Sequence, residues 1–316
     1  MSRALVFPGQ GSQAVGMGKA LAAAYPQARA VFEEVDDALS QALSELMFEG
    51  PLEPLTLTSN AQPALMATSL AALRVLEAEA GLDVARDVAF LAGHSLGEYS
   101  ALAAGGALSI TDTARLLRIR GNAMQEAVPV GAGAMAALIG IEIEGAREIA
   151  AEAAEGDVCD VANDNGGGQV VVSGHKPAVE RAVAIAQARG VKRAVMLPVS
   201  APFHCALMAP AAEAMRAALA EVTISAPKAP VVANVTAAPA SDPHAIREAL
   251  VAQVTGTVRW RESVAHMAGE GVDAFVEVGA GKVLSGLVKR IAAGSATQAV
   301  GTPDDVGAFQ AAFQRG

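Results

Sequence analysis

The sequence predicts an α/β protein whose main parallel sheet is interrupted by a smaller inserted domain. Near both ends of the chain, short apolar runs typical of buried strands alternate with helical apolar patterns, which favours a parallel sheet. The middle of the chain instead follows a β-α-β-β-α-β order, the ferredoxin-like unit. Of the 316 residues, 52% are hydrophobic and 18% are charged, so apolar material is ample for a core and charge is too sparse for disorder.

The first segment of the main domain is expected over residues 1–128. Pro8 ends its first strand, and Gly81 ends a long helix rich in Ala and Leu. A later helix is predicted to begin with Thr111 as its N-cap. The expected strands are 4–7 and 88–92, and the expected helical stretches are 20–42, 63–80, 96–104 and 111–127.

The inserted domain is expected over residues 129–198, with proline and glycine residues at both ends. Its predicted strands are 135–139, 158–162, 169–173 and 193–197, its helices are 143–154 and 177–188, and NDNGGG forms a turn. The main domain then resumes over 199–316. There we expect strands at 231–234 and 274–278 and helices at 207–220, 245–253, 264–268 and 283–290.

Charge and cysteine content exclude several classes of protein. A net charge of −10 disfavours nucleic acid and anionic membranes as partners, although local basic spots remain. The two cysteines, Cys159 and Cys205, show neither metal-type spacing nor a disulfide pattern, so we expect a reduced, cytoplasmic setting. The sequence has no long apolar run of the kind found in signal peptides or membrane spans. The basic spots are Lys192-Arg193, Arg259 with Arg261, and Lys289-Arg290.

The stretch GHSLG at residues 93–97 is a candidate nucleophile elbow centred on Ser95. Gly-x-Ser-x-Gly between a strand and a helix places the serine oxygen on a sharp turn at the start of the helix. The backbone N–H of Leu96 would then stabilise an oxyanion at this helix end. The structural alternative is a glycine-rich turn with a capping serine.

A nucleophilic serine needs a base, and His204 is the best placed of the five histidines. It stands on a proline-bearing loop where the main domain resumes, a position that suits a cleft. A hydrolase triad would add an acid between the serine and the histidine, yet no aspartate in that interval follows a main-sheet strand. The sequence therefore predicts a Ser-His dyad in which another group, such as a backbone carbonyl, orients His204.

Five motifs stand in a specific order along the chain: FPGQGSQ (7–13), GHSLGEYSAL (93–102), RGNAMQ (120–125), PFHCALM (202–208) and EVGAGKVLSGLVKR (277–290). In this combination the chain resembles the malonyl-CoA:acyl carrier protein transacylase family of bacterial type II fatty acid synthesis. The resemblance covers nearly the whole chain. It implies an α/β-hydrolase-like large domain with a ferredoxin-like insertion, which agrees with the fold predicted from the residues.

The resemblance also implies catalytic roles. Ser95 matches the family's nucleophile and His204 its general base. The backbone amides of Gln10 and Leu96 match the oxyanion hole. Gln253 matches the residue whose backbone carbonyl holds the histidine, which would explain the missing acid.

Arg120 matches the arginine that pairs with the free carboxylate of a malonyl group. A guanidinium pairs a carboxylate bidentately, and an unpaired buried arginine would penalise an acetyl group in its place. The alternative is that Arg120 is an arginine on a helix surface without a role in substrate binding. Met124 lies one helical turn further on, and Met124, Phe203, Asn163 and His94 are further candidates for lining the pocket.

The function that the resemblance implies is ping-pong transfer of a malonyl group from malonyl-CoA to the phosphopantetheine thiol of acyl carrier protein, through a malonyl-serine intermediate. No metal or redox cofactor is expected. The acidic carrier protein would dock on one of the basic spots, and we expect a monomer. The sequence leaves open whether the carrier serves fatty acid or polyketide synthesis, and whether methylmalonyl is tolerated.

Three alternatives compete with this interpretation. A serine thioesterase would share Ser95 and His204 but pass the acyl group to water. A carrier-binding module would need no catalytic residues. Residues 9–14 also fit the loose dinucleotide fingerprint G-x-G-x-x-A, although Pro8 stiffens that turn and no second strand ends in an acidic residue at the expected distance.

Overall fold

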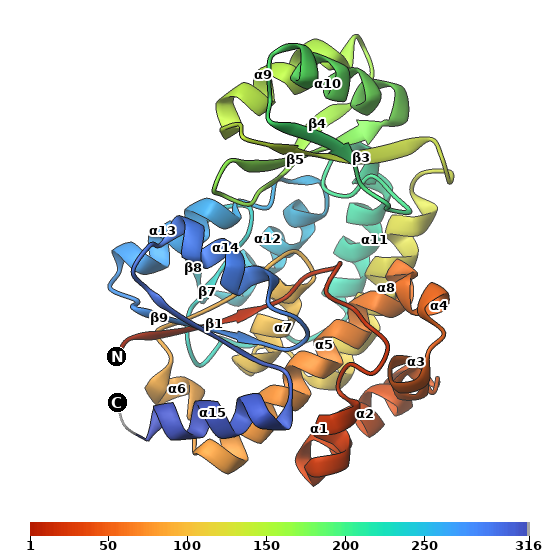
Figure 1. Cartoon of the computed structure of the whole chain (residues 1–316). Coiled ribbons are helices and arrows are strands. Elements are labelled where there is room, and N and C mark those ends of the chain that lie inside the picture. Colours follow the sequence, from red (N-terminus) through yellow and green to blue (C-terminus); the bar gives the residue numbers. More distant parts are fainter. Residues whose placement is uncertain (315–316) are drawn as a thin grey trace.

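The computed structural model describes residues 1–314 and has an α/β architecture built on two separate sheets (Figure 1). The larger sheet has six strands in the order β10-β9-β1-β2-β7-β8. All its pairings are parallel except that of β7 with β8. Its strands are β1 (Arg3–Phe7), β2 (Phe90–Gly93), β7 (Val231–Val232), β8 (Pro239–Ala240), β9 (Ala274–Val278) and β10 (Ala296–Val300).

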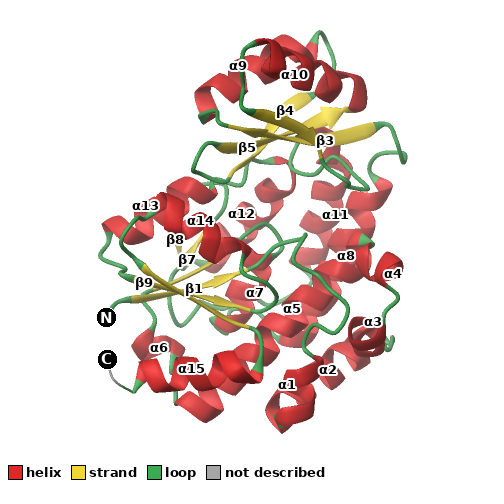
Figure 2. Cartoon of the chain, in the orientation of Figure 1, coloured by secondary structure: helices red, strands yellow, loops and turns green. Residues whose placement is uncertain are grey.

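Both faces of the larger sheet are buried. Alternate side chains of each strand point to opposite faces and enter two different cores. On β1, Leu5 and Phe7 join a large core that also includes α2, α5, α8 and α11, whereas Ala4 and Val6 join a smaller core with α13 and α14. Helices therefore cover the sheet on both sides (Figure 2), as parallel sheets require.

Helices of the first half and the last third of the chain surround this sheet. Within residues 1–314, no helix has the length and apolar character needed to cross a membrane. The helices are α1 (Lys19–Ala24), α2 (Pro26–Leu39), α3 (Leu43–Glu49), α4 (Leu52–Thr56), α5 (Thr58–Val75), α6 (Val84–Asp87), α7 (Gly97–Ala104), α8 (Ile110–Glu126), α11 (Ala209–Ala220), α12 (Pro243–Thr255), α13 (Trp260–Gly269), α14 (Val283–Ile291) and α15 (Pro303–Phe313), with short π and 3-10 turns at Leu76–Ala80 and Ala206–Met208.

The smaller sheet is antiparallel, has the order β4-β5-β3-β6, and forms the upper part of Figure 1. Its strands are β3 (Gly133–Ile139), β4 (Cys159–Asp164), β5 (Gln169–His175) and β6 (Arg193–Met196). Helices α9 (Ile143–Ala154) and α10 (Lys176–Ala188) pack on it around a core of their own. The β-α-β-β-α-β order confirms the predicted fold class: a mainly parallel sheet plus a ferredoxin-like unit.

Several predicted element limits are wrong for local reasons. The helical stretch 20–42 is divided at Tyr25, which is extended because it precedes Pro26. The helix expected from residue 63 begins at Thr58 and contains Pro63. The N-cap of α8 is Ser109 rather than Thr111, and the Ser109 hydroxyl accepts a hydrogen bond from the amide of Asp112 at 2.9 Å.

Three further differences concern the ends of strands and the end of the chain. Asn163 and Asp164 belong to β4 and not to the predicted turn. The last described part of the chain adds β10 and α15, which the sequence did not predict because ATQAV has little apolar character. Strand β10 pairs with the full length of β9 and extends the parallel sheet by one strand.

Candidate active site

Ser95 lies in the turn between β2 and α7, with a left-handed φ of 53°. Neighbouring glycines make this turn possible. A Cβ on Gly93 would lie 1.9 Å from the carbonyl carbon of Gly97, and a Cβ on Gly97 would lie 2.2 Å from the carbonyl oxygen of Phe7. Backbone crowding thus requires both glycines of the Gly-x-Ser-x-Gly pattern: Gly93 lies against the start of α7 and Gly97 lies against the end of β1.

His204 lies beside the serine. The Ser95 Oγ is 2.7 Å from His204 Nε2, and His204 Nδ1 donates to the backbone carbonyl of Gln253 at 2.9 Å. A carbonyl oxygen can only accept, so Nδ1 carries the proton and Nε2 is free to accept from the serine hydroxyl. Burial, reinforced by the positive charge of Arg120, lowers the pKa of His204 to about 3, so the imidazole is neutral at pH 7.

Arg120 comes from α8 and is 1% exposed. Its Nη1 donates to Gln62 Oε1 at 2.8 Å, and its Nη2 donates to Gln253 Oε1 at 2.8 Å and to Ser95 Oγ at 3.2 Å. Burial lowers the pKa of Arg120. Because all three of these acceptors are neutral, its charge remains available for an anionic group next to the serine.

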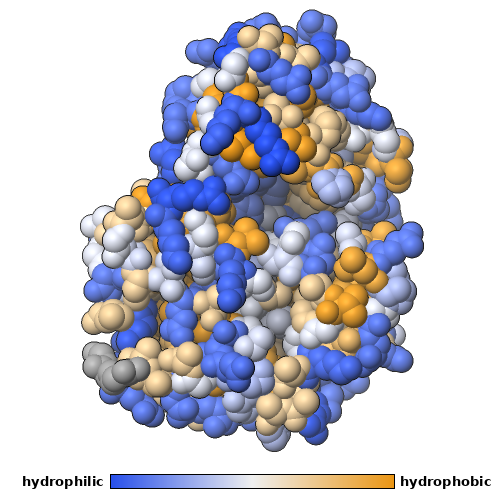
Figure 3. Space-filling model, in the orientation of Figure 1, coloured by the Kyte–Doolittle hydropathy of each residue, from blue (hydrophilic) through white to orange (hydrophobic). Residues whose placement is uncertain are grey.

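These residues share one cavity of about 320 Å³, within the size range of small-molecule sites. The larger part of the molecule supplies Gln10, Ser95 and Arg120, and the antiparallel unit supplies Met135 and Asn163. The visible face of the molecule is hollowed between these two parts (Figure 3). The cavity also brings together His94, Met124, Phe203 and His204, all of them predicted from the sequence.

The two predicted residues outside the cavity lining, Leu96 and Gln253, lie directly behind the serine. Leu96 is the N-cap of α7, and none of the hydrogen bonds among residues 1–314 uses its backbone amide. Gln253 contributes more than the carbonyl predicted for it, because its side-chain Nε2 donates to the carbonyl oxygen of Ser95 at 2.9 Å. One residue therefore contacts the serine, the histidine and the arginine.

His94 and Asn163 mark the edge that the cavity shares with a second one of about 480 Å³. His94 is paired with Asn165, whose Oδ1 lies 2.8 Å from His94 Nε2, and burial lowers the pKa of His94. The second cavity extends to Lys282 and Arg290. The remaining histidines, His175, His244 and His266, lie on other elements and line neither cavity.

Three buried polar residues of the site were not predicted: Gln62, Glu98 and Asn234. Gln62 stands in the polar first part of α5, TSNAQ, and carries no distinct signal, whereas Glu98 is the one charged residue of α7, GEYSALAA, and this signal was available in the sequence. Asn234 follows β7 and carries no such signal. Burial raises the pKa of Glu98 to about 7.

Neither a metal site nor a dinucleotide site is supported in the described part of the chain. Residues 1–314 contain no cluster of three or more His, Cys, Asp or Glu side chains arranged to hold a metal ion. The turn at residues 9–14 does not open a helix, since α1 begins only at Lys19, so it lacks the helix N-terminus that binds a pyrophosphate.

Comparison with known proteins gives concordant results. The model of the acyl transferase domain family matches residues 4–315. The malonyl CoA-acyl carrier protein transacylase of Escherichia coli K12 is 48% identical over 288 residues, which is 91% of this chain and 92% of that protein. The structure of an acyl-carrier-protein-S-malonyltransferase from Bartonella henselae is 57% identical, with a TM-score of 0.97 over 99% of this chain and 100% of that one.

A malonyl-transacylase solved in complex with its type II PKS acyl-carrier protein is also similar. It is 42% identical, with a TM-score of 0.95, and the match covers 100% of both chains. The likeness therefore extends over both sheets and the cavity between them.

Proposed function

Because this chain belongs to the acyl transferase domain family, we propose that it transfers a malonyl group from malonyl-CoA to the phosphopantetheine thiol of acyl carrier protein, supplying fatty acid synthesis. The observation that carries the proposal is the buried guanidinium of Arg120, 3.2 Å from the Ser95 Oγ. A malonyl group differs from acetyl by a carboxylate, and Arg120 offers that carboxylate a desolvated cationic partner.

In the first half-reaction, His204 Nε2 takes the proton of the Ser95 hydroxyl as Oγ attacks the thioester carbonyl. The carbonyl oxygen becomes an oxyanion, which the backbone amides of Gln10 and Leu96 stabilise. Collapse of this intermediate breaks the C–S bond, and protonated His204 gives its proton to the departing CoA sulfur. The products are free CoA and a malonyl ester of Ser95.

In the second half-reaction, the carrier-protein thiol enters the emptied cavity. His204 removes the thiol proton, the sulfur attacks the malonyl-serine ester, and the same two amides stabilise the second oxyanion. Cleavage of the ester C–O bond returns the proton from His204 to Ser95. Every proton in this scheme moves through His204, and no metal or redox cofactor takes part.

The charge of Arg120 links substrate binding to the strength of the base. Arg120 is the second cause, after burial, of the low pKa of His204. A malonyl carboxylate paired with Arg120 cancels part of that repulsion and so makes His204 more basic when the correct substrate is bound. An acetyl group leaves the arginine unpaired, which disfavours it by a few kcal/mol, or about 10²-fold.

The remaining pocket residues shape the space around the acyl group. Met124 and Phe203 provide apolar walls, and Asn163 and His94 lie where the pantetheine arm would pass between the two cavities. We assign residues 1–128 and 199–316 to the catalytic domain and 129–198 to the inserted one. In this proposal the enzyme is a cytoplasmic monomer without nucleic-acid or membrane partners, and the carrier protein docks on a local basic spot.

The proposal is tested by incubating the enzyme with malonyl-CoA and a holo acyl carrier protein, then measuring the carrier's mass and the free malonate. The expected result is a malonylated carrier, formed by wild type and not by Ser95→Ala. Free malonate with an unmodified carrier would indicate a thioesterase. No turnover, with carrier binding that survives in Ser95→Ala, would indicate a binding module.

A further inference from the structure

The backbone of Ser95 is held from both sides by side chains that come from distant parts of the chain. Its φ of 53° is a conformation that residues other than glycine rarely adopt. The amide of Ser95 donates to Asn234 Oδ1 at 2.8 Å, and its carbonyl oxygen accepts from Gln253 Nε2 at 2.9 Å. The amide of Ser95 is therefore bonded by a side chain, and its carbonyl oxygen accepts from the Gln253 side chain and also from the backbone amide of Glu98 at 3.0 Å.

Asn234 is itself placed by the sheet. Strand β7 pairs in parallel with β2, so Asn234 emerges at the same edge as Ser95. Its Nδ2 donates to the carbonyl oxygen of Gly93 at 2.7 Å while its Oδ1 accepts from Ser95. One primary amide thus spans the turn, from the last residue of β2 to the nucleophile.

Glu98 lies behind both contacts. One of its carboxylate oxygens, Oε2, accepts from the backbone amide of Asn234 at 3.0 Å and from Gln253 Nε2 at 2.8 Å. Glu98, Asn234 and Gln253 are 2%, 1% and 0% exposed. Removing the Glu98 carboxylate would take this acceptor away from the buried N–H groups of Asn234 and Gln253. Buried N–H groups that lose an acceptor lower stability.

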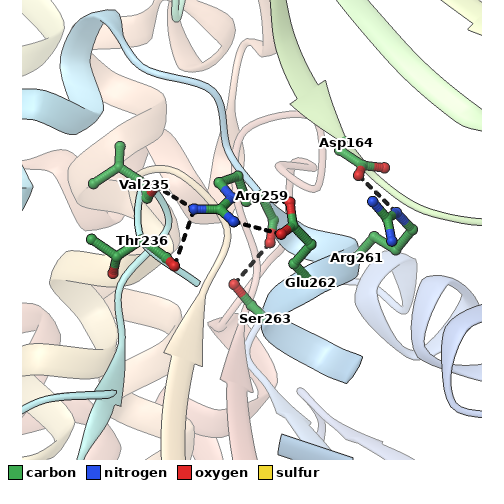
Figure 4. Close-up of polar contacts among 7 residues, drawn as sticks. All are labelled: Asp164, Val235, Thr236, Arg259, Arg261, Glu262 and Ser263. Atoms are coloured by element: carbon green, nitrogen blue, oxygen red, sulfur yellow. Dashed lines mark hydrogen bonds and ion pairs between the residues drawn. The ribbon is translucent and has the colours of Figure 1, made fainter. Parts of the chain in front are cut away.

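The loop that carries Asn234 has an outer support, drawn in Figure 4. The amide of Arg259 donates to the Asn234 carbonyl at 3.0 Å. In Figure 4, Nη1 of Arg259 donates to the carbonyls of Val235 and Thr236, at 3.2 and 3.1 Å. Glu262 and Ser263, on the following helix α13, bond to Arg259 in turn. The position of Asn234 is thus fixed by elements that do not line the cavity.

We propose that Asn234 and Glu98 are positioning residues, which hold the Ser95 backbone in its left-handed conformation so that Oγ stays in line with His204. The inference rests on the proposed function in so far as malonyl-CoA is the substrate used to test it. Neither residue lines the cavity, so the effect is on the geometry of the nucleophile and not on substrate contacts. Displacing a reacting atom by about 1 Å costs on the order of 10²-fold in rate.

The role of Glu98 in this proposal is geometric. Its single oxygen serves as an acceptor for two N–H groups, and an amide oxygen in the same place accepts equally well. Glu98→Ala should slow the reaction, whereas Glu98→Gln should restore it to within about threefold of wild type. If the negative charge itself were required, Glu98→Gln would be as slow as Glu98→Ala, and the positioning role of Glu98 would be wrong.

The experiment measures the burst of CoA released from malonyl-CoA without carrier protein. Its amplitude counts competent active sites and its rate constant reports acylation of each site. We expect Asn234→Ala to keep most of the amplitude while the rate falls about 10²-fold. A parallel reaction with a fluorophosphonate, a serine reagent without a carboxylate, should slow by a similar factor, because the defect lies in the nucleophile.

Glu277→Ala is the matched control. Glu277 is another fully buried carboxylate, and it accepts from the amides of Leu284 and Ser285 at 3.0 and 2.7 Å, away from the serine. Its loss should lower thermal stability and amplitude without changing the rate per competent site. If Asn234→Ala is poorly folded, Asn234→Ser, whose hydroxyl is too short to span the turn, replaces it.

A wild-type rate per competent site in the Asn234 variants would overturn the inference, because any loss would then be confined to amplitude, as in Glu277→Ala. A loss with malonyl-CoA alone, and not with the fluorophosphonate, would also contradict it and assign the effect to Arg120. A wild type that reacts with the fluorophosphonate but not with malonyl-CoA would instead contradict the proposed function, and the Asn234 comparison would still be decided by the fluorophosphonate.

Discussion

Strand β1 is flanked by β2 on one side and by β9 on the other. The turns that follow β2 and β9 are similar in their elements but differ in their backbone and hydrogen bonding. Each strand is followed by a glycine-containing turn and a helix, α7 after β2 and α14 after β9. Each turn is also close to a fully buried glutamate, Glu98 or Glu277. In the proposed function the turn after β2 is the reactive one, and the turn after β9 is structural.

After β9 the positive φ values fall on glycines, and a neighbouring carboxylate caps the next helix. The unusual φ values of 130° and 83° belong to glycines, Gly279 and Gly281. The carboxylate of Glu277 accepts the amides of the first turn of α14, so that helix end is already occupied by an anion.

After β2 the left-handed position belongs to a serine, and Glu98 bonds to Asn234 and Gln253 instead of capping α7. Glu98 lies in the first turn of α7, but the hydrogen bonds of its carboxylate come from Asn234 and Gln253 and not from the amides at the start of the helix, which lies beside a cavity that contains a buried arginine. An oxyanion that forms there can accept from the backbone amides at the start of α7, which no carboxylate caps. The turns thus differ in the placement of one buried carboxylate and in the residue type, serine or glycine, that takes the positive φ.

The largest expected effect comes from removing the base at the reactive turn. His204→Ala should lower the rate of Ser95 acylation by on the order of 10⁴-fold or more, because the serine hydroxyl loses its proton acceptor. The rate is measured as CoA release in a stopped-flow instrument, with circular dichroism as the check on folding. A folded variant within about tenfold of wild type would show that the reactive turn works without this base.

The next effect concerns the choice of acyl group. Arg120→Ala should reduce the preference for malonyl-CoA over acetyl-CoA by about 10²-fold, because the malonyl carboxylate loses its buried partner. Competing acylation by the two thioesters gives this ratio directly. Arg115→Ala is the control, since Arg115 is an exposed arginine on the same helix. An unchanged ratio would remove Arg120 from substrate selection.

The turn after β9 should respond in stability and not in chemistry. In Gly279→Ala a Cβ would lie 2.3 Å from Ser69 Oγ, at a φ of 130°. We expect the free energy of unfolding in urea to fall by about 2–4 kcal/mol while the acylation rate per competent site changes little. An unchanged unfolding midpoint would mean that Gly279 is not required in this turn. The turn after β9 would then not be the structural counterpart of the turn at Ser95.

The smallest expected effect is the response to pH. Because the pKa of His204 is lowered to about 3, the neutral base should persist as pH falls below the ordinary histidine pKa of about 6.5. The kcat/KM for malonyl-CoA, which reports the free enzyme, should therefore be nearly flat between about pH 8 and pH 5. Glu98→Gln, measured in parallel, removes the titration of Glu98, whose pKa is about 7. A drop centred near pH 6.5 in both proteins would contradict the buried, neutral His204.

The low pKa of His204 also affects folding stability. Between pH 6.5 and about 3 the unfolded chain binds a proton at this residue that the folded chain does not. The stability contributed by His204 is therefore complete above pH 6.5 and is lost as the pH falls through that window.

The residues predicted from the sequence are those whose setting is local. Ser95 was predicted because a strand, two glycines and a helix follow one another directly in the chain, and backbone crowding explains each glycine. Arg120 and His204 lay within motifs that resemble one family. The prediction of a dyad without an acid agrees with the carbonyl of Gln253, a group that every residue possesses, so only the family resemblance pointed to this residue.

The residues that were missed act over long distances along the chain. Asn234 lies 139 residues from Ser95 and reaches it only because β7 pairs with β2. Glu98 and Gln62 have roles that depend on which helices and loops pack around them. Pairing across a sheet sets these contacts, and a single sequence carries little information about strand order.

The most direct test of the account is the mass of the intact protein after brief mixing with malonyl-CoA, without carrier protein, for wild type and Ser95→Ala. Acetyl-CoA is run in parallel. We predict that wild type gains the mass of one malonyl group, that Ser95→Ala gains nothing, and that acetyl-CoA gives little adduct. A malonyl adduct that persists in Ser95→Ala, or CoA release from wild type with no adduct at all, would contradict the assignment of Ser95 as the acyl carrier between the two thiols.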